Sequence, residues 1–360
     1  MSLVSAVSRL AAVGVAAAVA LVLSVRAPAQ DSFASRIAAL SEEPGYFDTD
    51  NLISNEGSYL HVVTALGRDK IRGGAYIGVG PDQNFSYIAS IRPSVAFIID
   101  VRRDNLLLHL LFKALFDLSR TRVEFLALLL SRPVPEPLEP WHAKTIEELT
   151  TYIDSASAAS VAAVRSRVTE RIRGFGVALS EQDLLTIDRF HRRFIEEGLN
   201  LQFHSTGRPP QSYYPTYRQL LLETDLDGRR SNYLASEAGF QFVKSLEARD
   251  LVIPVVGNLN GSNALSAIGR FLNERHERLM AFYASNVEYY LFSEGTFQRF
   301  VENLGRLPRA DRAVIIRSIF RGAIRVTSGY GSVSTTQPIG ELVDGYARGR
   351  YHEYWELAGK

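Results

Sequence analysis

The chain has 360 residues, of which 46% are hydrophobic, and its formal net charge is +1. A chain of this length and composition can bury a large core in one domain or two. The balanced charge gives no electrostatic reason to expect nucleic acid as a partner, and the absence of cysteine excludes disulfides and thiolate metal ligands.

The first 29 residues have the pattern of a secretory signal peptide. Arg9 precedes an apolar run at residues 10–25, and Ala27 and Ala29 place small residues at the −3 and −1 positions of a cleavage site. We therefore expect export to the periplasm or the medium, with cleavage after Ala29. One alternative is an uncleaved membrane anchor formed by residues 10–25, although a spanning helix needs about twenty apolar residues. Another is an ordinary buried helix.

Two short helices, at 31–41 and 59–66, are expected before the first strand. The segment between them carries four polar residues, Asn51, Ser54, Asn55 and Glu56. These side chains line a ligand cleft if the segment packs beside the first strand. The alternative is ordinary capping of the second helix by Ser54 or Asn55, with Glu56 in its first turn.

Residues 73–105 predict two strands that alternate with two helices. In chain order the elements are a strand at 75–79, a helix at 85–91, a strand at 95–99 and a helix at 103–116. The first strand is short and apolar, as in a buried parallel sheet, and it ends in a tight turn at Gly78 and Gly80. Asn84 is expected to cap the first helix. The second strand ends in Asp100.

This order of elements points to a nucleoside-type ligand. Gly78 and Gly80 let the backbone turn sharply and approach a ligand closely. The amides that open the next helix suit an anion or a carboxylate. Asp100 lies about twenty residues beyond the glycines, where an acid accepts hydrogen bonds from ribose hydroxyls. The alternative is a structural turn whose acid only caps the following helix.

Between the second and third predicted strands, residues 133–249 show helical spacing and no strand pattern of any length. A stiff, proline-rich segment at 132–140 opens this region. Helices are expected at 145–155, 158–173, 180–198, 217–223 and 236–248. The third has clear ends, because Ser180 is an N-cap, Asp183 completes a capping box and Gly198 stops the helix. We expect the region to form a helical layer over the carboxyl ends of the strands.

The sheet resumes after this insertion. Strands are expected at 251–256, 278–284 and 313–320, and helices at 264–274, 297–304 and 339–357. The polar, glycine-rich residues 330–338 predict a loop. Strands that alternate with helices indicate a parallel sheet covered on both faces, with ligands at the carboxyl ends of its strands. The residues that follow the third and fourth strands are Gly257, Asn258, Ser285, Asn286 and Glu288.

Other chemistry has little support. Tyr213, Tyr214 and Tyr217 either line a substrate mouth or pack helices together, and His204 is the histidine best placed for a site. The sequence has no Gly-x-Ser-x-Gly elbow, no His-Glu-x-x-His zinc motif and no phosphate-loop lysine. No metal site is expected.

Five stretches together resemble a known family, and one of them is Tyr-Pro-Thr-Tyr-Arg-Gln-Leu-Leu-Leu-Glu-Thr-Asp at 214–225. The other four are Gly-Val-Gly-Pro-Asp-Gln-Asn at 78–84, Ile-Asp-Val-Arg-Arg-Asp-Asn at 99–105, Val-Ile-Pro-Val-Val-Gly-Asn at 252–258 and Ala-Phe-Tyr-Ala-Ser-Asn-Val-Glu-Tyr-Tyr-Leu at 281–291. The chain is similar in them, and over about residues 45–357, to an uncharacterised bacterial family. That family has a Rossmann-type fold similar to S-adenosylmethionine-dependent methyltransferases.

The resemblance implies a doubly wound, mostly parallel α/β sheet with a large helical insertion. It also implies S-adenosylmethionine as the cofactor, held by Gly78, Gly80, Asp82, Asp100 and Asn258. Asn286 and Glu288 are the implied catalytic residues. The chain departs from the methyltransferase pattern at Tyr76 and Asn258, where acids are usual, and at Asp82, which replaces a third glycine.

The sequence thus predicts an exported protein that binds an S-adenosylmethionine-type nucleoside ligand, with methyl transfer to an unknown small molecule. The alternative is a non-catalytic exported protein that keeps the fold and serves as a binding or interaction module. The expected division is a signal peptide at 1–29, the first part of the core at 30–132, the helical insertion at 133–249, and the second part of the core with a C-terminal helix at 250–360.

Overall fold

The computed structural model describes residues 32–157, 160–206, 211–320 and 329–358. The predicted signal peptide or membrane anchor lies outside these residues. Within them, no helix has both the length and the apolar character needed to cross a membrane.

Six strands form a single sheet in the described part of the chain. They are β1 (Ala75–Val79), β2 (Val95–Asp100), β3 (Val252–Val256), β4 (Leu279–Ser285), β5 (Arg309–Phe320) and β6 (Ser332–Pro338). Their order is β3-β2-β1-β4-β5-β6; the first five strands are parallel, and β6 runs antiparallel to β5. The expected α/β architecture with a mostly parallel sheet is confirmed. The strand order reverses between β1 and β4.

The central strands are apolar because helices cover both faces of the sheet. Every residue of β1 and β3 is buried, and so is every residue of β2 before Asp100. Pro254 lies in β3, where it cannot donate a ladder hydrogen bond. β3 is an edge strand, which is the position in a sheet that tolerates proline.

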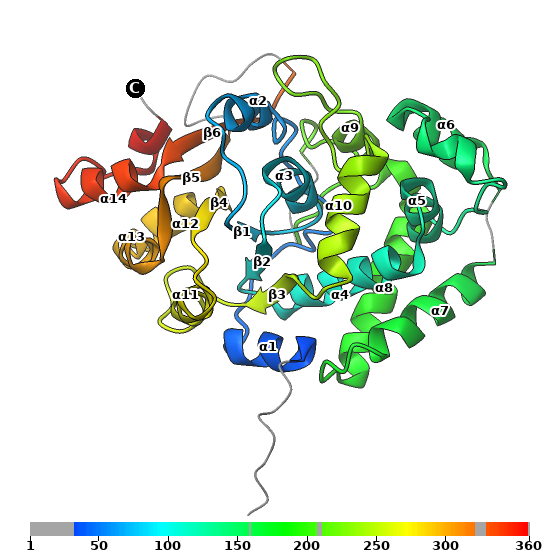
Figure 1. The fold of residues 1–360 in the computed structure, drawn as a ribbon, viewed down its shortest axis with the longest axis horizontal. Coiled ribbons are helices and arrows are strands. Elements are labelled where there is room, and N and C mark those ends of the chain that lie inside the picture. The colour runs from blue at the N-terminus through cyan, green and yellow to red at the C-terminus, as the bar shows by residue number, and fades with distance from the viewer. Residues whose placement is uncertain (1–31, 158–159, 207–210, 321–328, 359–360) are drawn as a thin grey trace, which may run out of the picture. The chain divides into compact units, whose positions relative to one another are not determined.

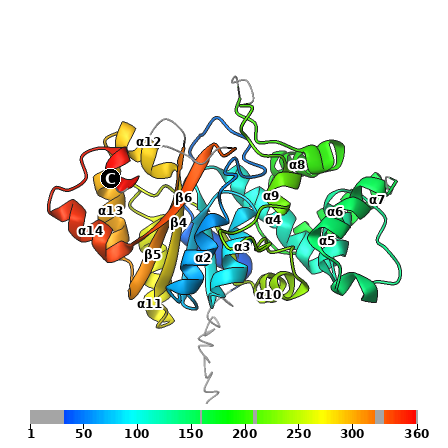
Figure 2. The same cartoon turned by 90° about the horizontal axis from the view of Figure 1, so that it is seen from above.

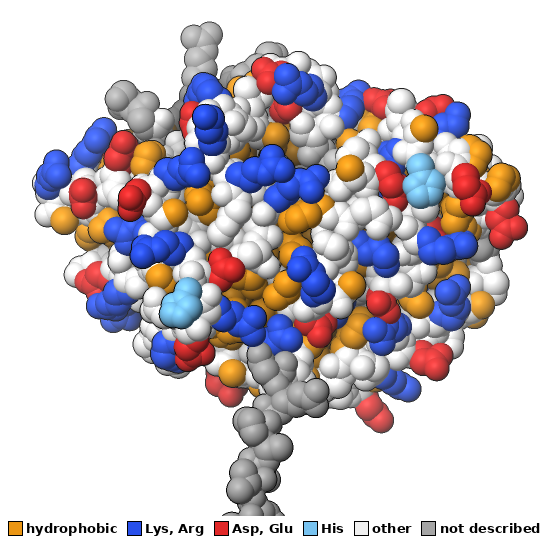
Figure 3. All heavy atoms as spheres, viewed as in Figure 1, with side chains coloured by type: hydrophobic (Ala, Val, Ile, Leu, Met, Phe, Trp, Pro, Cys, Tyr) orange, Lys and Arg blue, Asp and Glu red, His pale blue; other side chains and the backbone are white. Residues whose placement is uncertain are grey.

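Two layers of helices cover the sheet (Figures 1 and 2). One layer contains α2 (His61–Arg68), α3 (Gln83–Ile91), α4 (Arg103–Leu118) and α10 (Glu237–Glu247). The other contains α11 (Ala264–Glu274), α13 (Phe297–Arg306) and α14 (Ile339–Ala347). The first helix, α1 (Phe33–Leu40), packs against β3 and α11. On the face shown in Figure 3, basic and acidic side chains are interspersed.

The region between β2 and β3 is helical, as predicted. After α4 come α5 (Arg122–Leu129), α6 (Ile146–Ser155), α7 (Val161–Arg173), α8 (Glu181–Glu197), α9 (Tyr217–Leu221) and α10. The predicted ends of α8 are confirmed. The Ser180 hydroxyl accepts from the Asp183 amide at 3.1 Å, and the Asp183 carboxylate accepts from the Ser180 amide at 2.8 Å.

The expected position is wrong for three of these helices. Helices α5, α7 and α8 pack against α4, on the side of α4 that faces away from the sheet, instead of lying over the strand ends (Figures 1 and 2). The reason lies in α4, whose residues 105–116 are all buried. A helix whose buried residues are mostly apolar and lie on all its sides needs neighbours on its outer surface as well as the sheet.

The edge strand β6 was predicted as a loop. Its residues are mostly serine and threonine, so the sequence lacks the apolar alternation of a strand. Two buried hydrogen bonds between hydroxyl groups stabilise β6: Ser332 bonds Ser58 at 3.0 Å, and Ser334 bonds Ser318 at 3.0 Å. A short helix, α12 (Val287–Ser293), was also not expected.

Candidate functional site

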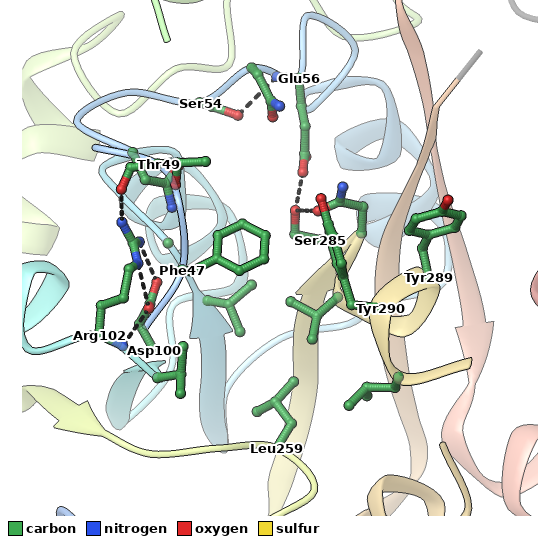
Figure 4. A pocket seen from close by; sticks show the side chains of 18 of the residues that line it. Phe47, Thr49, Ser54, Glu56, Asp100, Arg102, Leu259, Ser285, Tyr289 and Tyr290 are labelled. Carbon is green, nitrogen blue, oxygen red and sulfur yellow. Dashed lines mark hydrogen bonds and ion pairs between the residues drawn. The ribbon is translucent and has the colours of Figure 1, made fainter. Parts of the chain in front are cut away.

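A cavity of about 640 Å³ opens at the carboxyl ends of the parallel strands (Figure 4). Every parallel strand contributes residues at its end: Val79, Gly80, Asp100, Gly257, Asn258, Ser285, Asn286 and Phe320. The cavity lies where the strand order reverses, which is where open α/β sheets bind ligands. Its volume is in the range of roughly 300–1,000 Å³ that is usual for small-molecule sites.

The side chains of Tyr76 and Asn84 pack against the turn after β1 and stabilise it by hydrogen bonds. A Cβ atom on Gly78 would lie 2.0 Å from the Asn84 Oδ1 atom and 2.5 Å from the Tyr76 hydroxyl, so packing requires glycine there. Gly78 itself does not line the cavity. The expected N-cap role of Asn84 is wrong, because Asp82 is the N-cap residue of α3. Asn84 accepts from the Tyr76 hydroxyl at 2.7 Å and donates to the carbonyl oxygens of residues 79–81.

Gly80 does line the cavity, and its φ of 83° lies in the left-handed region. Its carbonyl oxygen is 2.9 Å from the Nε2 atom of His109 on α4. Burial lowers the pKa of His109 to about 4, so the ring is neutral at pH 7 and Nε2 carries the donated proton. Sequence reasoning missed His109, because it lies within the leucine-rich run of α4.

Asp82, a predicted cofactor ligand, is buried outside the cavity lining. Its Oδ2 atom accepts from the hydroxyls of Tyr217 at 3.2 Å and Tyr233 at 3.4 Å, both from the insertion. Burial raises the pKa of Asp82 to about 7. The hydrogen bonds from Tyr217 and Tyr233 to Asp82 join the turn after β1 to the insertion. Of the predicted tyrosines, Tyr217 packs here, whereas Tyr213 and Tyr214 line the cavity.

Asp100 lines the cavity and forms an ion pair with Arg102 (Figure 4). The Arg102 guanidinium donates to both carboxylate oxygens, at 3.0 Å and 2.8 Å, and the Arg102 amide donates to Oδ1 at 2.9 Å. Arg102 also donates to the carbonyl oxygen of Thr49 at 2.8 Å. The Oδ2 atom of Asp100 accepts only one hydrogen bond from Arg102, so it can accept another from a ligand. The pair fixes the carboxylate at the end of β2.

The N-terminal segment follows the ends of β2 and β3. The Gly45 amide donates to the carbonyl oxygen of Val101 at 2.8 Å. The Glu42 carboxylate accepts from the amide of Asn258 at 2.6 Å. Asn258 lines the cavity, as predicted, beside the buried Leu259. Four polar side chains from the same N-terminal segment also reach the cavity: Asn51, Ser54, Asn55 and Glu56.

Glu56 is the centre of a buried hydroxyl cluster. Its carboxylate accepts from the Tyr283 hydroxyl at 2.6 Å and also from the hydroxyls of Ser285 and Ser318. The side chain is 1% exposed, and burial raises its pKa against the opposing effect of these three hydrogen bonds. Ser285 ends β4 with a φ of 53°, a left-handed conformation that few residues other than glycine adopt.

The two predicted catalytic residues lie in different surroundings. Asn286 lines the cavity next to Ser285. Glu288 is fully buried outside the cavity lining, in a two-bond ion pair with Arg317 at 2.6 Å and 3.0 Å. Arg317 also donates to Gln337 on β6 at 2.8 Å. The Glu288 pair thus joins α12, β5 and β6, and it does not face a ligand.

The raised pKa of Glu56 leads to a prediction about stability. Above pH 4.5 the unfolded chain loses the proton of the Glu56 carboxyl group, whereas the folded protein still holds it. The free energy of unfolding therefore falls as the pH rises from 4.5 toward the raised pKa. Replacing Glu56 with Gln removes this loss. In urea denaturation at a series of pH values, the stability of Glu56→Gln relative to wild type should therefore increase with pH. Glu302→Gln, at an exposed glutamate on α13, is the control. A difference that does not change with pH would contradict the prediction.

Residues 52–342 match a family model described as "Domain of unknown function (DUF7790)". The match includes all six strands, the insertion and the cavity residues from Ser54 to Phe320. A comparison with curated proteins gives no match.

Proposed function

The chain belongs to the DUF7790 family, a domain of unknown function, and we propose that its cleft binds a nucleoside-type ligand of the S-adenosylmethionine kind. One observation carries the proposal: Gly80, Asp100 and Asn258 lie at the carboxyl ends of three adjacent strands and line one wall of the cavity. A ribose near Asp100 would find the free acceptor capacity of Oδ2. A base near Asn258 would have Val101 and Leu259 as apolar neighbours.

The form of the sheet favours this ligand over a dinucleotide. The strand order is that of a doubly wound nucleotide-binding sheet, but the last strand is antiparallel. A dinucleotide fingerprint also needs a third glycine, and Gln83 takes that position. In methyltransferase-like sheets an acid usually stands where this chain has Tyr76. Here the bond from Tyr76 to Asn84 stabilises the turn instead.

The proposed reaction is methyl transfer to a small molecule, with S-adenosylmethionine supplying the methyl group. In this proposal Gly80, Asp100 and Asn258 hold the nucleoside, and Asn286 binds the second ligand. Glu56 lines the same cavity, so its carboxylate is placed to accept the proton that the attacking group loses.

Calorimetric titration tests the proposal. Wild-type protein should bind S-adenosylmethionine and S-adenosylhomocysteine, and it should not bind NAD. Gly80→Ala should weaken binding, because it forces a Cβ into the lining at a positive φ. Gly176→Ala is the matched control: it imposes similar backbone strain in the insertion, where nothing lies within 4 Å.

Wild-type protein that binds neither nucleoside at millimolar concentration would overturn the proposal. The alternative of a non-catalytic exported binding module would then take its place. Loss of binding in Gly176→Ala as well as Gly80→Ala would mean that the strain, and not the cleft, controls affinity.

A further inference from the structure

We propose that the part of the cleft around Glu56 is a binding site for an organic cation, such as an alkylated ammonium or sulfonium group. The inference goes beyond the nucleoside proposal and does not depend on it. Three observations carry it: a buried carboxylate with no cationic partner, an aromatic wall, and the charges of the cavity lining.

The first observation is the environment of Glu56. Its carboxylate accepts hydrogen bonds from Tyr283, Ser285 and Ser318, and all three partners are neutral hydroxyls. No basic side chain among the described residues forms an ion pair with Glu56. A buried carboxyl group either has a charged partner or keeps its proton, because desolvation of the charged form is costly. Glu56 lines a cavity, so a bound cation would supply the missing charge.

The second observation is the set of rings beside Glu56. Figure 4 shows its side chain pointing toward Ser285, with Phe47 on one side and Tyr290 on the other. The rings of Phe47 and Tyr290 are 4.9 Å apart and perpendicular, and Tyr289 continues the row at 5.3 Å from Tyr290. Aromatic faces attract cations that approach within about 6 Å of the ring centroid.

The rim of the cavity is aromatic as well. Six large hydrophobic side chains of the described residues are strongly exposed, and four of them line this cavity. Those four are Tyr46, Tyr213, Tyr289 and Trp355. Exposed aromatic side chains concentrated at one opening are typical of a binding site, because they are costly to leave in water without a partner.

The third observation is the charge of the lining. Glu56, Asp100 and Glu294 are its acids, and Arg102 is its only base among the described residues. Arg102 is already paired with Asp100. The remaining acids, Glu56 and Glu294, would repel an anionic ligand and attract a cationic one.

Choline and 3,3-dimethyl-1-butanol are suitable probes, since they have nearly the same shape and differ in charge. The chain has two tryptophans, and Trp141 packs against Tyr152 in the insertion. In a Trp141→Phe background, fluorescence therefore reports on Trp355 at the rim of the cavity. At about pH 8 a larger fraction of Glu56 is ionised than at lower pH. Under this condition choline should bind about tenfold or more tightly than the neutral alcohol.

Two variants locate the source of this preference. Glu56→Gln should reduce the difference between the probes, because only the aromatic rings and Glu294 then favour the cation, and Glu302→Gln, outside the cavity, should retain it in full. Equal affinities in the wild-type background, no choline binding at tens of millimolar, or an undiminished preference in Glu56→Gln would each overturn the proposal.

A competition experiment separates two sources of the cation. If S-adenosylmethionine displaces choline, the site holds the sulfonium of the nucleoside ligand. If both bind together, the site holds the ammonium of a second ligand. Choline contains no nucleoside, so failure of the nucleoside titrations would leave this result intact.

Discussion

Replacing Glu288 with alanine is expected to destabilise the protein by about 3–5 kcal/mol, the usual cost of removing one partner of a buried ion pair. Glu288 and Arg317 are 0% and 1% exposed, and their two hydrogen bonds are 2.6 Å and 3.0 Å long. The alanine variant leaves the Arg317 guanidinium without a carboxylate in the interior. Urea denaturation of wild type and variant, with the same slope for both, measures the difference.

Two controls sharpen this prediction. Glu302 forms a surface pair with Arg306, with side chains 45% and 70% exposed, so Glu302→Ala should cost less than about 1 kcal/mol. The double variant Glu288→Leu with Arg317→Met removes both charges and should recover much of the lost stability. A single Glu288 variant as stable as the Glu302 variant would mean that the buried pair contributes nothing.

Replacing Asp100 with alanine is expected to lower the affinity for a ribose-containing ligand by roughly ten- to a hundredfold. A hydrogen bond to a charged group contributes on the order of 1.5–3 kcal/mol, and about 1.4 kcal/mol is tenfold in affinity. The substitution also leaves Arg102 without its partner, since the two form a bidentate pair. The affinity loss by itself therefore does not separate ribose binding from local support.

A double-substitution cycle, with one change in the protein and one in the ligand, separates ribose binding from local support. Wild type and Asp100→Ala are titrated with 5′-methylthioadenosine and with its 2′,3′-dideoxy analogue, and the four affinities give the coupling energy. If Asp100 accepts from the ribose, wild type prefers the hydroxylated ligand and the variant does not. If Asp100 only holds Arg102, both proteins discriminate equally between the two ligands, which would contradict the proposed role.

Local patterns correctly predicted most elements of the core. The run at 75–79 and the helix at 264–274 match β1 and α11 in the structure. The capping box at Ser180 and Asp183 is also as predicted. In each case the information lies within a few residues: apolar periodicity for a buried element, and a hydroxyl and an acid three residues apart for a helix end.

Two positions show what local patterns do not contain. Residues 332–338 form a strand although their side chains are polar, because backbone pairing with β5 and hydroxyl contacts from Ser58 and Ser318 replace apolar packing. The family resemblance assigns Asp82 to the cofactor, whereas the structure buries its side chain outside the cavity lining. Its partners, Tyr217 and Tyr233, are more than 130 residues away in the chain.

The sequence by itself determined the α/β class, the insertion and the strand ends that line the cleft, including Gly80, Asp100 and Asn258. Parallel strands place their carboxyl ends at one edge, so these positions follow from local patterns and one topological rule. Tertiary structure alone decided what each acid does. Glu56, Asp100 and Glu288 look alike in the sequence, yet one faces hydroxyls in the cavity and two are paired with arginines. A carboxylate's role depends on its burial and its partners, and both are set by residues distant in the chain.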